Sequence, residues 1–251
     1  MTTIDLNCDM GESYGAWKMG ADAEIMPWIT SANIACGFHA GDPATIRKTV
    51  RLAVDNGVAV GAHPSLPDLM GFGRRVMRIS PQDMYDLVIY QAGAVEAFAR
   101  AAGVKLHHVK CHGALYNMAV NDEALSDAMV RAVQDLGSGL ILYALSGSKT
   151  LAMGKKAGVR VAGEVFADRG YADDGTLAPR DRPGGLIEDP DASVKQVLGM
   201  VGEGYVTSLG GKRVTVSADT LCLHGDQPGA VLFAQTLRKV FVEKGIDVAA
   251  P

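Results

Sequence analysis

Residues 29–43 read Ile-Thr-Ser-Ala-Asn-Ile-Ala-Cys-Gly-Phe-His-Ala-Gly-Asp-Pro, and this stretch shows the unit from which the chain is built. A short, mainly apolar run ends in polar residues, among them His39. Asp42 and Pro43 then form a helix start, because an aspartate side chain accepts hydrogen bonds from free backbone amides and proline at the first helical position loses none. The apolar period that follows continues to Gly57, which favours a left-handed stop. The stretch therefore predicts a β-strand followed by a capped α-helix.

The same unit recurs, with further helix starts predicted at residues 80–83, 121–123 and 189–190. The strand exits carry residues that can move protons or bind charge. Besides His39, these exits are residues 7–12, 61–64, 110–113, 164–169 and 224–226. In parallel α/β folds, ligands bind at the carboxyl ends of the strands, where the loops converge. We therefore expect these exits to form one site.

The number of units bounds the fold. Further strands are predicted at residues 3–9, 58–63, 105–111, 140–145, 160–166 and 220–224, and Gly210-Gly211 indicates a hairpin. The chain has 251 residues, which suits one α/β barrel of about 250 residues, but seven strand–helix pairs are one short of a regular eightfold barrel. We predict an α/β fold with a single domain over residues 1–251, an irregular seven-stranded TIM-like β/α barrel. A doubly wound open sheet is the alternative.

The composition excludes several classes of protein. A net charge of −4 and a pI near 5.8 give no broad basic field that would capture nucleic acid. No apolar run approaches the roughly 20 residues that span a membrane, and polar residues interrupt the start, where a secretory signal would lie. The four cysteines form no CxxC pair, and we expect buried thiols in a reducing compartment. These features favour a cytoplasmic protein that acts on a small molecule.

Two strands carry polar residues on one face. In the first strand Asp5, Asn7 and Asp9 alternate with apolar residues, and a polar face inside a small barrel indicates a site. In the fourth strand Lys110 shares a face with His108 and His112. A buried ammonium without a partner is costly, so this lysine is expected to have a function.

Three segments bear on ligand binding. Residues 68–75 contain glycines and two arginines and are either a substrate lid or a solvated loop, whereas residues 172–185 are either a lid or a partner surface. Residues 146–150 look like a phosphate loop, but the Walker pattern would need glycine in place of Tyr143 and Ser148. We therefore expect no Walker nucleotide loop in this chain.

Six blocks carry a resemblance to a known family, over essentially the whole chain. They are LNCDMGE at residues 6–12, SANIACGFHAGD at 31–42, GAHP at 61–64, VKCHGALY at 109–116, EVFADR at 164–169 and LHGD at 223–226. In these blocks the sequence resembles the LamB/YcsF family. The resemblance implies an irregular barrel of the glycoside hydrolase/deacetylase type. It also implies ATP-dependent opening of 5-oxo-L-proline (pyroglutamate) to L-glutamate, with ATP as a co-substrate accompanied by magnesium, in a complex with two further subunits, B and C (PxpB and PxpC).

Hydrolysis of an amide needs a base for water, an acid for the leaving nitrogen and a cation for the oxyanion. The candidate catalytic residues are Asp9, Glu12, His39, His63, Lys110, His112, Glu164 and His224. We expect Asp9 to be the base, with Glu12 as its substitute, and Lys110 to hold the substrate carboxylate or the oxyanion. The histidines would shuttle protons or bind a metal. Candidates for substrate binding are Asn7, Asn33, Arg74, Arg169 and Asp226, of which Asp226 would orient His224.

Two other functions fit the same residues. The chain could be a metal-dependent deacetylase, or an amide or glycoside hydrolase, that acts alone. Three ligands of a catalytic zinc would then come from Asp9, His39, His63, His112 and His224. It could also be a binding subunit for a sugar or amino acid without catalysis. The sequence leaves open whether a metal is bound and which subunit holds ATP.

Overall fold

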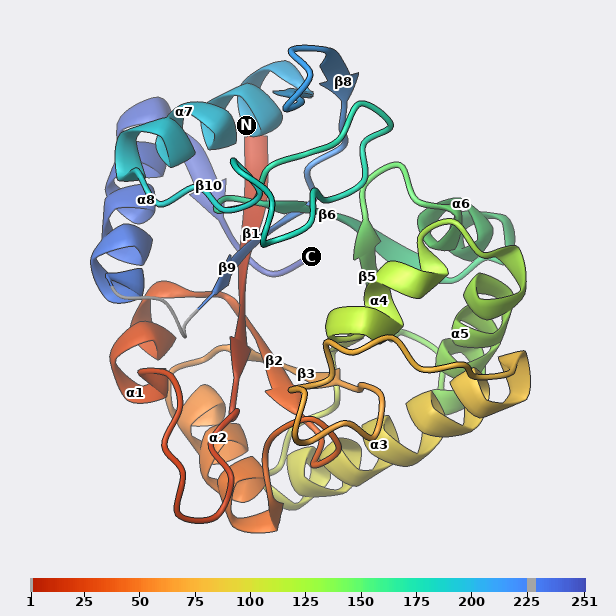
Figure 1. Cartoon of the computed structure of the whole chain (residues 1–251). Coiled ribbons are helices and arrows are strands. Elements are labelled where there is room, and N and C mark those ends of the chain that lie inside the picture. The colour runs from red at the N-terminus through yellow and green to blue at the C-terminus, as the bar shows by residue number, and fades with distance from the viewer. Residues whose placement is uncertain (1, 225–228) are drawn as a thin grey trace.

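The computed structural model describes residues 2–224 and 229–251, and within these ranges seven parallel strands close into a barrel (Figure 1). The barrel strands are β1 (Thr2–Met10), β2 (Ser31–Ala35), β3 (Ala59–His63), β4 (His108–Val109), β5 (Ile141–Leu145), β6 (Arg160–Phe166) and β9 (Thr220–His224). Each strand pairs with the next in this order, and β9 returns to pair with β1, with Asp9 opposite His224. This closure confirms the irregular seven-stranded barrel and excludes the open sheet.

Helices surround the barrel. The longer ones are α2 (Pro43–Asp55), α3 (Pro81–Ala101), α5 (Glu123–Leu136), α6 (Lys149–Lys156), α7 (Pro190–Glu203) and α8 (Ala230–Lys244), and the short ones are α1 (Asp22–Ile25), the 3-10 helix η1 (Met26–Trp28) and α4 (Gly113–Ala119). Four of them begin at caps that the sequence predicts. Asp42, Asp122 and Asp189 each accept from two backbone amides, and Ser80 forms a reciprocal capping box with Asp83.

Two further strands form the predicted hairpin, β7 (Tyr205–Thr207) and β8 (Arg213–Thr215), which pair antiparallel. A last strand, β10 (Ile246–Val248), pairs with the first residues of β1 outside the barrel and has no counterpart among the sequence predictions. In the described part of the chain, none of the helices has the length and apolar character needed to cross a membrane.

The fourth strand differs from its predicted range of 105–111. Ladder pairing is confined to His108–Val109, although the amides of His107 and Lys110 still donate to carbonyls of β3. Gly113, at φ 57°, then turns the chain into α4, which the sequence did not predict. Helix α6 was missed as well. Residues 146–150, which look like a phosphate loop, provide the N-terminal cap of α6, because the Ser148 hydroxyl accepts a hydrogen bond from the amide of Leu151.

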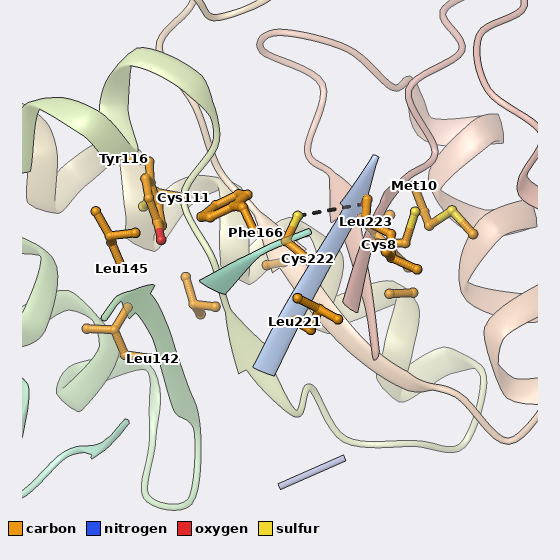
Figure 2. Packing of buried hydrophobic residues seen from close by; sticks show 14 of the residues in the cluster. Cys8, Met10, Cys111, Tyr116, Leu142, Leu145, Phe166, Leu221, Cys222 and Leu223 are labelled. Atoms are coloured by element: carbon orange, nitrogen blue, oxygen red, sulfur yellow. Dashed lines mark hydrogen bonds between the residues drawn. The ribbon is translucent and has the colours of Figure 1, made fainter. Parts of the chain in front are cut away.

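The apolar core lies between the barrel and its helices. Ile4, Leu6 and Cys8 of β1 belong to it and are completely buried. Figure 2 shows Cys8 next to Leu223 of β9, its partner in register. The opposite face of β1 points into the barrel, which is therefore polar along this strand. All four cysteines are buried and free of disulfides.

Candidate active site

A cavity of about 600 Å³ opens at the carboxyl ends of the barrel strands, a size typical of small-molecule sites. Seven of the sequence-predicted site residues line it: Asp9, His63, Arg74, Lys110, His112, Arg169 and His224. Five others do not line it: Asn7, Glu12, Asn33, His39 and Glu164. Asp226 lies outside the described residues.

Lys110 lies at the centre of the site, and its side chain is 3% exposed. Its Nζ is 2.9 Å from Asp9 Oδ1, 2.8 Å from Glu164 Oε1 and 3.0 Å from Asn7 Oδ1. Burial lowers the pKa of Lys110, but the carboxylates of Asp9 and Glu164 more than offset it, so the pKa lies well above its usual value. The ammonium is therefore charged and already has protein anions as partners. From the sequence, the substrate was expected to supply the anion.

Asp9 joins Lys110 to a histidine. Its Oδ1 accepts from Lys110 and from the Asn33 amide at 2.8 Å, and its Oδ2 is 3.1 Å from His63 Nε2. Burial raises the pKa of Asp9, but the neighbouring His63 and Lys110 hold it well below its usual value. Asp9 is therefore an ionised carboxylate at the cavity wall.

Below the cavity, amides hold these groups in place. Asn33 Nδ2 donates to Asn7 Oδ1 at 2.7 Å, while Asn33 Oδ1 accepts from His108 Nε2 at 2.8 Å. Asn7 Nδ2 in turn donates to the Thr220 hydroxyl at 2.7 Å. Asn7 and Asn33 were expected to bind substrate, but the structure uses their amides to position Asp9 and Lys110.

The hydrogen bonds of His63 and His112 fix their tautomers. A backbone carbonyl only accepts, so His63 Nδ1 donates to Lys110 O at 2.7 Å and His112 Nε2 donates to Phe72 O at 2.9 Å. The remaining nitrogens, His63 Nε2 and His112 Nδ1, face each other at 3.0 Å beside Asp9 Oδ2. These acceptor atoms require a shared proton or a cation between them.

Phe72 delivers its carbonyl from an unusual backbone. Among the described residues it is the one non-glycine residue with positive φ, at 54°. Such strain persists where the surroundings determine it, often at functional sites. The loop at 68–75 is thus fastened to the histidines.

His39 and Glu12 complete this group. His39 is buried, and neither ring nitrogen has a hydrogen-bond partner among the described residues. Glu12 Oε1 is 4.0 Å from His39 Nε2 and 4.0 Å from His112 Nδ1. Burial holds the pKa of His39 and of His112 well below the usual value, so both rings are neutral near pH 7.

Glu12, His39, His63 and His112 are therefore a buried group that can bind a metal ion, with donor atoms within 4.8 Å of one another. The rings of His39 and His112 stack at 4.0 Å and 10°. A single ion cannot lie in both ring planes, so one of the two rings would have to turn to share it.

A second histidine–carboxylate pair lies on another wall. His224 Nδ1 is 2.7 Å from Asp168 Oδ2, and Arg180 Nη2 is 2.9 Å from His224 Nε2. Asp226 was expected to orient His224, but in the described residues Asp168 does so. Burial raises the pKa of Asp168, but His224 and Arg180 lower it, and the net shift is downward.

Residues 172–185, here called the strap, form part of the cavity wall through positions 176–181. Arg169 holds the strap, donating from Nε to Gly185 O at 3.0 Å and from Nη2 to Ala178 O at 2.6 Å. Two donors of Arg169, an expected substrate ligand, are thus used within the protein. Arg74 is exposed at the rim, with its guanidinium 4.8 Å from the centre of the Phe72 ring.

Tyr116, Asp168 and Arg180 were missing from the sequence-predicted site. Tyr116 donates to Glu164 Oε2 at 2.7 Å, and it lies within the block at 109–116 that carried the resemblance. Asp168 is in the block at 164–169. Arg180 is in the segment predicted to be a lid or a partner surface, which was the available signal for it.

Known proteins resemble the chain along its full length. The A-type subunit of 5-oxoprolinase from Tolumonas auensis is 55% identical over 250 residues, which are 100% of both chains. The crystal structure of a lactam utilization protein from Thermus thermophilus is 48% identical, with a TM-score of 0.93 over 99% of this chain and 100% of that one. The fold alone is shared with the catalytic domain of a peptidoglycan N-acetylglucosamine deacetylase from Eubacterium rectale, which is 10% identical with a TM-score of 0.52 over 100% of this chain and 88% of that one. The LamB/YcsF family profile matches residues 4–251, and the chain therefore belongs to the LamB/YcsF family.

Proposed function

We propose that this chain is the A-type subunit of an ATP-dependent 5-oxoprolinase and opens the ring of 5-oxo-L-proline to give L-glutamate. The observation that carries the proposal is the presence of two histidine–carboxylate pairs on one cavity, His63 with Asp9 and His224 with Asp168. Opening a lactam needs one group to take a proton from water and another to give a proton to the ring nitrogen. The names of the full-length relatives support the same reaction.

In this mechanism each pair has one task. The low pKa of Asp9 makes it a weak base by itself, so His63 exchanges the proton and Asp9 stabilises the imidazolium. Lys110 keeps Asp9 ionised and sets its position. His224, oriented by Asp168, serves the ring nitrogen on the other side of the bound lactam.

ATP enters because the substrate is unreactive. A five-membered lactam is an unstrained amide stabilised by resonance, and phosphorylation of its oxygen activates the ring carbon towards water. Departure of the protonated ring nitrogen then leaves an acyl phosphate, and hydrolysis of this acyl phosphate by a second water gives L-glutamate and phosphate. Since the chain has no Walker pattern, we assign nucleotide activation, with magnesium, at least partly to the partner subunits B and C (PxpB and PxpC). The need for ATP and the free thiols favour a cytoplasmic location for the complex.

Reconstitution tests the proposal. The isolated chain is expected to hydrolyse neither ATP nor 5-oxo-L-proline at a useful rate, and addition of both partners is expected to couple the two reactions. Glutamate release is measured with and without ATP. Rapid ATP-dependent glutamate formation by the isolated chain would show that the division of labour is wrong.

Histidine variants test the two pairs in the same assay. His63→Gln and His224→Gln are each expected to lower kcat by roughly 10²- to 10⁴-fold, the range of general acid–base catalysis. His107→Gln is the matched control, because His107 contacts Pro251 and is not part of the cavity wall. Near-normal turnover of either site variant would remove that pair from the mechanism.

A second candidate function is metal-dependent hydrolysis by this chain alone. The observation that favours it is the group formed by Glu12, His39, His63 and His112, which offers a zinc ion three imidazoles and one carboxylate once either His39 or His112 has turned out of their stack. Such an ion would lower the pKa of a bound water. Metal analysis of the purified chain, and assay of acetylated sugars and simple amides before and after chelation, distinguish the two functions. Chelator-sensitive hydrolysis without partners or ATP supports this second candidate.

A further inference from the structure

Arg180 engages the outer nitrogen of His224. Its Nη2 lies 2.9 Å from His224 Nε2, and both side chains line the cavity. A guanidinium only donates, so Nε2 accepts with its lone pair, and Nδ1 carries the hydrogen that is donated to Asp168. Both ring nitrogens are thus in use. While Arg180 stays in place, His224 cannot exchange a proton with a substrate.

The cavity around Arg180 has an excess of guanidinium groups. The cavity is lined by three arginines, Arg74, Arg169 and Arg180, and also by the exposed Asp181. The pKa of Arg169 is lowered to about 10, first by burial and then by the charge of Arg180. Two neighbouring guanidiniums, one of them buried, favour the entry of an anion.

The partner that Arg180 now holds is a weak one. Arginine bonds an oxyanion through a charge-assisted and often bidentate contact, which is roughly twice as strong as a hydrogen bond between neutral groups. The strap is held at Ala178 and Gly185 by Arg169. Exchange of one partner for the other therefore needs rotation of the Arg180 side chain and leaves the strap in place.

We propose that Arg180 binds the anionic group of the substrate. When the Arg180 guanidinium moves from His224 to this anion, His224 Nε2 becomes free for proton transfer. The anion is the carboxylate of a small lactam acid or a phosphoryl group. Binding thus switches on the second histidine–carboxylate pair only when an anionic ligand is present. The identity of the lactam acid rests on the proposed function, whereas the exchange of partners at Arg180 does not.

Calorimetry on the isolated chain tests this exchange with three probes: 5-oxo-L-proline, its uncharged amide 5-oxo-L-prolinamide, and inorganic phosphate. Arg180→Gln is expected to raise the Kd of 5-oxo-L-proline by roughly 10- to 100-fold. The Kd of the uncharged amide is expected to stay within about twofold of the wild-type value. Arg180→Lys keeps a charge and is expected to recover part of the loss. Arg182→Gln is the matched control, since Arg182 is exposed on the same strap and does not line the cavity.

The ring of His224 gives a second readout. Its ¹⁵N signals are expected to shift when wild type is saturated with 5-oxo-L-proline. The anion-free Arg180→Gln variant is expected to show nearly the same signals already, because Nε2 has lost its donor. A role of Arg180 that is only structural would not produce this match.

The possible results distinguish failure of the anion site from failure of the proposed function. The proposal is overturned if Arg180→Gln weakens the binding of 5-oxo-L-proline and of its uncharged amide equally. It is also overturned if wild type binds neither 5-oxo-L-proline nor phosphate. Binding of phosphate but not of 5-oxo-L-proline, lost in the variant, supports the anion site and identifies the anion as a phosphoryl group. If anion binding depends on Arg180 while the reconstituted complex releases no glutamate, the proposed function fails and the anion site stands.

Discussion

At the scale of the residue, alternation along a strand was the useful signal. It placed Asp5, Asn7 and Asp9 on one face of β1, and those side chains point into the barrel. It also marked Lys110 as a residue that needs an anion. It could not show which anion, because Asp9 and Glu164 come from strands far away in the sequence. Partners of this kind follow from barrel closure, which no local pattern contains.

Replacing Lys110 tests this centre. Lys110→Met removes the charge that Asp9 and Glu164 share in a buried site, and breaking a buried ion pair costs about 3–5 kcal/mol. Both the unfolding free energy and the turnover of the complex are therefore expected to fall. Urea unfolding and glutamate release are measured side by side.

A double variant separates stability from activity. Lys110→Met with Glu164→Gln removes one of the two carboxylates that lose the ammonium in the single variant, so part of the lost stability is expected to return while turnover stays low. Recovery of turnover together with stability would mean that Lys110 has only a structural role.

At the scale of the element, strong caps and long apolar periods were read correctly. The helices after Asp42, Ser80, Asp122 and Asp189 begin at the predicted caps, and β6 and β9 have the predicted bounds. The missed elements, α4, α6 and β10, have 7, 8 and 3 residues. Elements so short carry too few periods to be recognised, and tertiary contacts decide their structure.

Glycine at position 61 of β3 tests how two strands approach inside the barrel. A Cβ atom at Gly61 would overlap Nε2 of His108 on β4, so Gly61→Ala is expected to cost about 1–3 kcal/mol of stability. Gly93→Ala in α3 is the matched control. Its Cβ meets no atom within 4 Å, and alanine is favoured over glycine in a helix by roughly 0.5–1 kcal/mol. A Gly61→Ala protein as stable as wild type would mean that His108 has room to move.

At the scale of the whole molecule, the site exists because the barrel closes. Asp9 and His224 lie opposite each other in register only because β9 returns to β1. The sequence predicted the strand exits and their common end. It did not predict that Asn7, Asn33 and Glu164 would lie beneath the cavity as supports, since depth along a strand depends on the stagger of its neighbours.

Closure also buries histidines, and this makes the stability of the fold dependent on pH. His108 lies inside the barrel with no exposed surface and stacks on Tyr143 at 4.2 Å. Burial holds the pKa of His108 well below 6.5, its usual value. The folded state therefore favours the neutral ring. This contribution is fully present above pH 6.5 and is lost as the pH falls from 6.5 towards the folded-state pKa, by at most about 1.4 kcal/mol per pH unit.

The His108→Gln variant isolates the contribution of His108 to the pH dependence of stability. Glutamine can still donate to Asn33 but does not titrate, and it loses the stack on Tyr143, so the variant is expected to be less stable than wild type at pH 7.5. Between pH 6.5 and 5 the variant is expected to lose stability more slowly, because the other buried histidines contribute to both proteins and cancel in the difference. Urea unfolding at several pH values measures the two slopes. Parallel slopes would mean that His108 is protonated equally in the folded and unfolded chain, and that the polar interior of the barrel admits more water than its burial indicates.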